Sequence, residues 1–75
     1  LKKVIKLSYG PNPTDGKVSV DGGRSDAAYQ IFDVQGRVVV KGELIDYSMD
    51  ISPLRAGMYF FQIEGLTGTN PIIKK

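Results

Sequence analysis

The sequence contains no cysteine and no histidine, and each absence excludes a kind of chemistry. Without cysteine the chain can form neither a disulfide nor a thiolate metal site. Without histidine it lacks the commonest general base and the commonest metal ligand, and its serines have no imidazole to activate them. We therefore expect no enzyme activity and no cofactor.

Long apolar runs and a strong net charge are also missing. No segment approaches the roughly 18 apolar residues of a membrane span, so no membrane span is predicted. The formal net charge is only +2, which does not indicate a nucleic-acid partner. Lysines gather only at the two ends, and we interpret them as solvated residues of edge strands rather than as a basic patch. They are Lys2, Lys3, Lys6, Lys74 and Lys75.

The length of 75 residues suits one domain with a single small core. We expect residues 1–75 to form this domain, with residues 1–8 as either an edge strand or the end of an upstream linker. The chain begins with Leu1 rather than methionine, from which we expect a longer parent protein.

The stretch from Tyr29 to Val40 has the pattern of a β-hairpin. Two runs rich in β-branched and aromatic residues flank a short polar segment that starts at Asp33 and ends at Gly36. The Asp33 side chain can accept hydrogen bonds from the backbone of the turn, and Gly36 can adopt the positive φ that closes such a connection. We predict that these two residues shape the fold.

Five further segments are predicted to be strands, because apolar and polar residues alternate along most of them: residues 1–9, 17–21, 47–51, 58–64 and 70–75. In the most apolar of these, Tyr59, Phe61 and Ile63 are expected to face the core. A bend is expected at residues 42–46, with Tyr47, Met49 and Ile51 on one side of the strand that follows. Residues 52–57 are expected to form one helical turn, from which Leu54 closes the end of the core.

These elements predict the fold class. Turn signals recur at the roughly 8–12-residue spacing of sandwiches. We predict an all-β fold, a compact antiparallel β-sandwich of about seven short strands (Ig-like) with no helix beyond one turn. A small open barrel is the alternative.

Three patterns in the sequence resemble binding sites. Gly10 to Lys17 begins and ends like a phosphate-binding loop, but its spacing is wrong and two prolines remove amides that would hold phosphate. The aspartates lack the spacing of a calcium loop and are interpreted as turn residues. Phe32, Met58 and Phe60 are candidates for an exposed apolar strip that binds sugars or proteins, although cover by loops is the simpler interpretation.

Five pieces of the sequence, taken in order, resemble the type A C-terminal sorting domain of the type IX secretion system, the Por secretion system sorting domain family. The resemblance extends from residue 9 to residue 75. Each piece alone is common, whereas five in the right order and spacing are specific. They are the turn Pro11, Asn12 and Pro13; residues 17–20; the hairpin with Asp33, Gly36 and Arg37; the segment with Leu54, Gly57 and Tyr59; and the basic end at Lys74 and Lys75.

The resemblance implies a transport signal rather than an enzyme. Such domains direct an N-terminal cargo from the periplasm through the outer-membrane translocon. A sortase-like surface peptidase typically removes the domain, so the cargo ends at the cell surface or outside the cell.

We expect the translocon to recognise the end of the chain, because an edge strand or a flexible end is a ready template for strand addition to a receptor. The residues expected to be recognised are Asn70, Pro71, Ile72, Ile73, Lys74 and Lys75. The alternatives are a carbohydrate-binding or adhesive accessory module that uses the Phe32 and Phe60 face, and a passive spacer.

Overall fold

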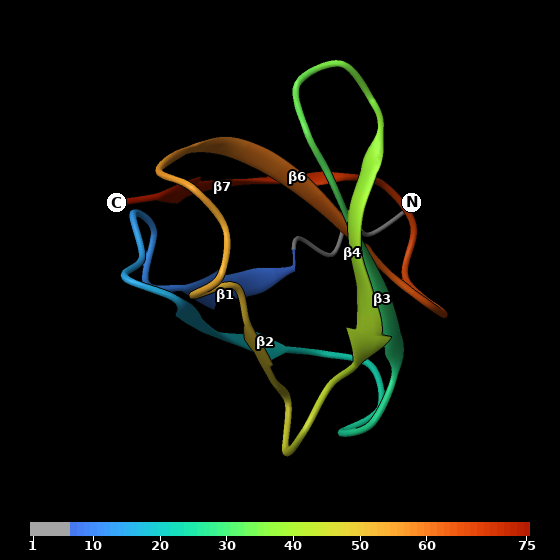
Figure 1. Cartoon of the computed structure of the whole chain (residues 1–75). Coiled ribbons are helices and arrows are strands. Elements are labelled where there is room, and N and C mark those ends of the chain that lie inside the picture. Colours follow the sequence, from blue (N-terminus) through green and yellow to red (C-terminus); the bar gives the residue numbers. More distant parts are fainter. Residues whose placement is uncertain (1–6) are drawn as a thin grey trace, which may run out of the picture.

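The structure, a computed structural model, describes residues 7–75, which form seven strands in two antiparallel sheets (Figure 1). One sheet has the order β1-β2-β5, with β1 at Ser8–Gly10, β2 at Lys17–Asp21 and β5 at Ser48–Asp50. The other has the order β4-β3-β6-β7, with β3 at Ala28–Phe32, β4 at Val38–Glu43, β6 at Gly57–Ile63 and β7 at Asn70–Lys74. The predicted all-β sandwich is confirmed, and residues 7–75 contain no helix.

The core forms from side chains of both sheets that point inward at every second position. In β2 the buried and exposed residues alternate strictly, and in β6 Phe61 and Ile63 are buried as predicted. Each sheet alone would leave one apolar face in water, so burial of these faces holds the two sheets together. The buried apolar residues are Val18, Val20, Ala27, Tyr29, Ile31, Leu44, Met49, Ile51, Phe61, Ile63 and Ile72.

The connection between β4 and β5 differs from the expected bend at residues 42–46. β4 runs through residue 43, and Leu44 is buried. A two-residue turn follows, in which Ile45 and Ser48 exchange two backbone hydrogen bonds of 2.9 and 3.0 Å. Asp46 and Tyr47 form its centre with φ angles of 52° and 64°. Tyr47 therefore lies in an exposed turn, and the prediction that it shares one side of the strand with Met49 and Ile51 is wrong, because the strand begins one residue later.

The helical turn expected at residues 52–57 is also wrong. A single β-turn stands there, closed by a hydrogen bond of 2.9 Å from the Leu54 amide to the Ile51 carbonyl. The Asp50 carboxylate, rather than the Ser52 hydroxyl, caps this turn by accepting the Ser52 amide at 2.9 Å. Leu54 packs against the core, as expected.

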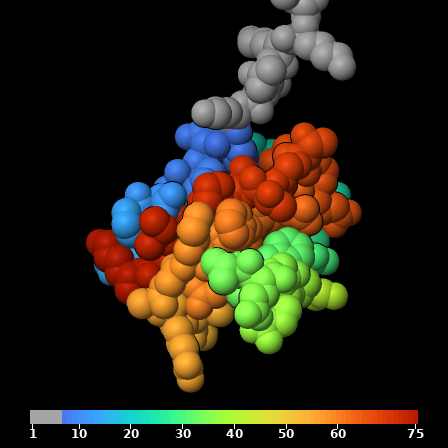
Figure 2. All heavy atoms as spheres, turned by 90° about the horizontal axis from the view of Figure 1, so that it is seen from above, coloured from blue at the N-terminus to red at the C-terminus, as the bar shows by residue number. Residues whose placement is uncertain are grey.

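The predicted first and last strands lie at the two ends of the chain. The first strand begins only at Ser8 among the described residues. The expectations for Lys2, Lys3 and Lys6, and for most of residues 1–8, lie outside the described residues. The last strand forms as predicted, and it pairs antiparallel with β6. Figure 2 shows this strand, in red, lying beside the light-blue segment that follows β1.

Candidate recognition surface

The predicted recognition residues, Asn70 to Lys75, consist of β7 and the residue after it. In the register with β6, Ile73 lies opposite Met58 and Ile72 lies opposite Tyr59. Ile72 is completely buried, whereas the Ile73 side chain is 44% exposed. The buried Ile72 thus anchors the strand in the core, whereas Ile73 faces solvent. It is an ordered edge strand rather than a loose end.

The outer edge of β7 is covered by the segment that follows β1. Thr14 donates its amide to the Ile73 carbonyl at 2.8 Å, and its own carbonyl accepts the Lys75 amide at 2.8 Å. Thr14 is itself only 1% exposed, and its hydroxyl bonds the Gly16 amide and the Lys17 carbonyl, each at 3.0 Å. A fully bonded, buried threonine therefore fixes this contact.

Two side chains complete the cover of the β7 edge. The Asn12 side-chain carbonyl accepts the Ile73 amide at 2.9 Å, and the Tyr9 hydroxyl donates to the Pro71 carbonyl at 2.6 Å. Proline has no amide to satisfy at this position. Three backbone groups of β7 that point away from β6, and the amide of Lys75 just after it, therefore already have partners. Strand addition at this edge would first require those hydrogen bonds to break.

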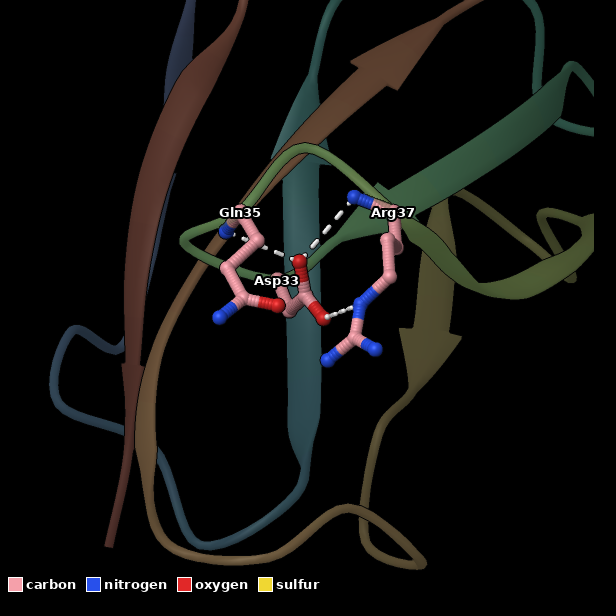
Figure 3. A network of polar contacts seen from close by, with 3 residues as sticks. All are labelled: Asp33, Gln35 and Arg37. Atoms are coloured by element: carbon pink, nitrogen blue, oxygen red, sulfur yellow. Dashed lines mark hydrogen bonds and ion pairs between the residues drawn. The ribbon is translucent and has the colours of Figure 1, made fainter.

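The hairpin residues form a separate polar network (Figure 3). One Asp33 carboxylate oxygen accepts the Gln35 and Arg37 amides at 2.9 and 3.0 Å, and the other lies 2.9 Å from the Arg37 Nε. The pKa of Asp33 is lowered, chiefly because its carboxylate accepts a hydrogen bond from the Arg37 amide. Gly36 has the predicted positive φ, 84°. This network closes the turn between β3 and β4.

The third group of motif residues, Leu54, Gly57 and Tyr59, leads into β6. Gly57 is paired with Lys74 in β7, and the Tyr59 hydroxyl donates to the Arg55 carbonyl at 2.8 Å. The structure therefore brings this group and the Asn12 loop to the same strand. Within residues 7–75, no hydrogen bond or ion pair joins the Asp33 hairpin to either of them.

The expected apolar strip lies on the outer face of the four-stranded sheet. Phe32 is the β-sheet partner of Phe60, and Phe60 is the partner of Pro71. Both rings are half-buried, while Met58 and its partner Ile73 are 45% and 44% exposed. Sequence reasoning missed Ile73 as a member of this strip. The outward position of Ile73, next to buried Ile72, is the signal that would have included it.

Residues 7–75 contain no group of three or more side chains placed to hold a metal ion. No helix in this part of the chain is long and apolar enough to cross a membrane. The fold defines a small antiparallel β-sandwich domain.

The family of this domain follows from its sequence as a whole. A family model described as a secretion system C-terminal sorting domain matches residues 9–75, and the chain belongs to this family. A comparison with curated proteins found no match. The family is non-catalytic, and membership makes the chain a C-terminal sorting signal for type IX secretion. It implies interaction with that machinery, an N-terminal cargo, and export to the cell surface or the extracellular space.

Proposed function

We propose that residues 1–75 act as one sorting domain, which carries its cargo from the periplasm through the outer-membrane translocon and is then removed by a sortase-like peptidase. The match to the sorting-domain family over residues 9–75 is the observation that carries this proposal. The lack of cysteine and histidine agrees with this proposal, since a folded tag works through surface shape and needs no reactive site.

We further propose that the translocon recognises the exposed side chains of Asn70 to Lys75 rather than the main-chain edge of β7. Hydrogen bonds with Tyr9, Asn12 and Thr14 occupy that edge, whereas the side chains of Ile73 and Lys75 project into solvent. An apolar side chain beside a basic one is a surface that a receptor can bind without unfolding the sheet.

The recognition proposal is tested by fusing the chain to a periplasmic reporter in a host that has type IX secretion. Deletion of β7 would remove the buried Ile72 and unfold the domain, so single exposed residues should be changed instead. Ile73→Asp and Lys75→Glu should each lower surface display of the reporter. Val34→Asp is the matched control, because Val34 is 68% exposed at the far hairpin. Unchanged display of both β7 variants would contradict recognition at this strand.

Cleavage is tested in the same strain with a tag after Lys75. If a peptidase removes the domain, the reporter on the cell surface should be shorter than the full fusion and should lack the tag. A full-length, tagged reporter at the surface would show that the domain stays attached. The carbohydrate-binding alternative gains no support from the fold, because the Phe32 and Phe60 rings are half-buried rather than open platforms.

A further inference from the structure

Among residues 7–75 the two sheets have four edge strands, and these strands differ in how many of their outward-pointing backbone groups are hydrogen-bonded. β7 is covered by the segment from Tyr9 to Thr14, as described above. In β5, the Ser48 amide and carbonyl are both bonded to Ile45. β1 has only three residues. Natural proteins cover or shorten edge strands in these ways because an open edge pairs readily with other chains.

The remaining edge, β4, is the longest of the four at six residues and has no cover among the described residues. The Leu44 amide donates to the Ala27 carbonyl at 2.8 Å, which places the backbone groups of residue 44 toward β3. Because these groups alternate along a strand, those of Gly42 also point toward β3 and those of Lys41 and Glu43 point away. Within residues 7–75, no hydrogen bond reaches the Lys41 or Glu43 backbone from that side.

The side chains along this edge limit what can pair there. Val38 and Val39 are 44% and 42% exposed, and the register with β3 is irregular beside them. A β-bulge interrupts regular pairing, so the open stretch that remains is short and centred on Lys41 and Glu43. These two charges share the outer face of the sheet, since their partners in β3, Gln30 and Ala28, alternate with the buried Tyr29.

We propose that β4 is a strand-addition site that binds a short extended segment of a partner polypeptide in antiparallel orientation. A row of alternating amides and carbonyls is matched in spacing and direction by the backbone of another strand. The side chains fix the chemistry of that segment: an acidic residue opposite Lys41 and a basic residue opposite Glu43, because opposite charges across a pair stabilise it and like charges do not. This site is separate from β7 and does not depend on recognition there.

The test uses the 75-residue chain and two synthetic seven-residue peptides of alternating valine and threonine. In the matched peptide a lysine and, two positions later, a glutamate are placed to face Glu43 and Lys41. In the control peptide the two charges are exchanged. Amide NMR spectra of the chain should show shifts and slowed hydrogen exchange at Lys41 and Glu43, with Ile73 unaffected. The matched peptide should bind about tenfold more tightly than the control.

A backbone variant separates strand pairing from simple charge attraction. Lys41→Pro removes an amide that points away from β3, a position where an edge strand tolerates proline. Lys41→Ala removes the same charge but keeps that amide. The alanine variant should retain peptide binding and the proline variant should lose it. If both bind alike, or if the shifts map to β7, the proposal is overturned.

Two controls keep the test decisive. If Lys41→Pro fails to fold, the double variant Lys41→Glu with Glu43→Lys takes its place, and its preference between the two peptides should reverse. An unchanged preference would overturn the proposal. Sedimentation of the chain without peptide tests whether a second copy of the chain pairs with β4. A dimer that Lys41→Glu abolishes and the double variant restores would assign this edge to a second copy and overturn the proposal.

Discussion

The side-chain carbonyl of Asn12 accepts a hydrogen bond from the Ile73 amide at 2.9 Å, across 61 positions of the chain. It joins a proline-flanked loop near the start of the domain to its last strand. The Ile73 amide points away from β6 and would otherwise be the open donor of an edge strand. An exposed edge invites pairing with other molecules, so this contact protects β7.

Replacing Asn12 with alanine should expose the edge of β7. We expect Asn12→Ala to lower the free energy of unfolding by about 0.5–1.5 kcal/mol, the usual net value of one hydrogen bond. Hydrogen exchange at the Ile73 amide should accelerate. Asn12→Asp keeps an acceptor oxygen and serves as the control. Chemical denaturation and amide exchange by NMR measure both effects, and equal exchange at Ile73 in all three proteins would show that the bond does not protect the edge.

Local patterns predicted the strands because alternation and turn chemistry act over a few residues. The valines of β2 and the aromatic residues of β6 alternate clearly, and Asp33 with Gly36 marks a turn. The same reasoning gave a wrong prediction for Tyr47. Its strand propensity is high, but a tight turn holds it at a positive φ, which a bulky residue rarely adopts.

The cover of β7 could not be predicted from sequence, since it depends on contacts between residues about 60 positions apart. Nothing local to Asn12 indicates that Ile73 lies beside it. The Pro11 to Pro13 segment could only be identified as a shaped loop, and the end of the chain only as a strand. Their association arises from packing of the whole sandwich, as does the contrast between the covered β7 and the open β4.

Gly16 is expected to tolerate no larger residue, because the backbone passes close to Ser52. A Cβ atom on Gly16 would lie 2.6 Å from the Ser52 Cβ and 2.9 Å from its Cα, and the neighbouring Ile51 amide donates to the Gly16 carbonyl at 2.6 Å. Gly16→Ala should therefore destabilise the domain by about 1–3 kcal/mol, as overpacking does. Gly10→Ala is the matched control, since no atom beyond Gly10 and its two chain neighbours lies within 4 Å of its added Cβ. Thermal unfolding of both variants checks this, and similar melting temperatures would contradict it.

Acid should destabilise the domain through two capped turns. Hydrogen bonds lower the pKa of Asp33, chiefly from the Arg37 amide, and the pKa of Asp50, chiefly from the Ser52 amide. A carboxylate with a lowered folded pKa stabilises the protein above its unfolded pKa of about 3.9, and this contribution is lost as the pH falls through the folded value.

Replacing each of these aspartates with asparagine should therefore make the stability of the domain depend less on pH in the acid range. Asp33→Asn and Asp50→Asn should melt below the parent protein at neutral pH, and the difference should shrink as the pH falls below about 4. Asp21→Asn is the control, because Asp21 is exposed and makes no side-chain hydrogen bond or ion pair with residues 7–75. Melting curves between neutral and acid pH measure the effect. A constant difference for all three variants would contradict it.

Tyr9 should make the stability of the domain sensitive to alkaline pH. Its hydroxyl donates to the Pro71 carbonyl at 2.6 Å, and its ring meets Phe61 edge to face with centroids 4.9 Å apart. Burial raises the pKa of Tyr9, and the phenolate form could not donate. Its contribution is therefore complete below the unfolded pKa of about 10 and is lost as the pH rises through the higher folded value.

Tyr9→Phe separates the hydroxyl from the ring. The ring contact with Phe61 should remain, while the loss of one hydrogen bond should cost about 0.5–1.5 kcal/mol at neutral pH. The difference between the two proteins should then shrink above about pH 10. The pKa of Tyr29 is also raised, mainly by burial, so the variant should keep part of the alkaline loss. Denaturation at neutral and alkaline pH measures both quantities. A difference that stays constant into the alkaline range would mean that the Tyr9 hydroxyl does not hold β7 to the start of the domain.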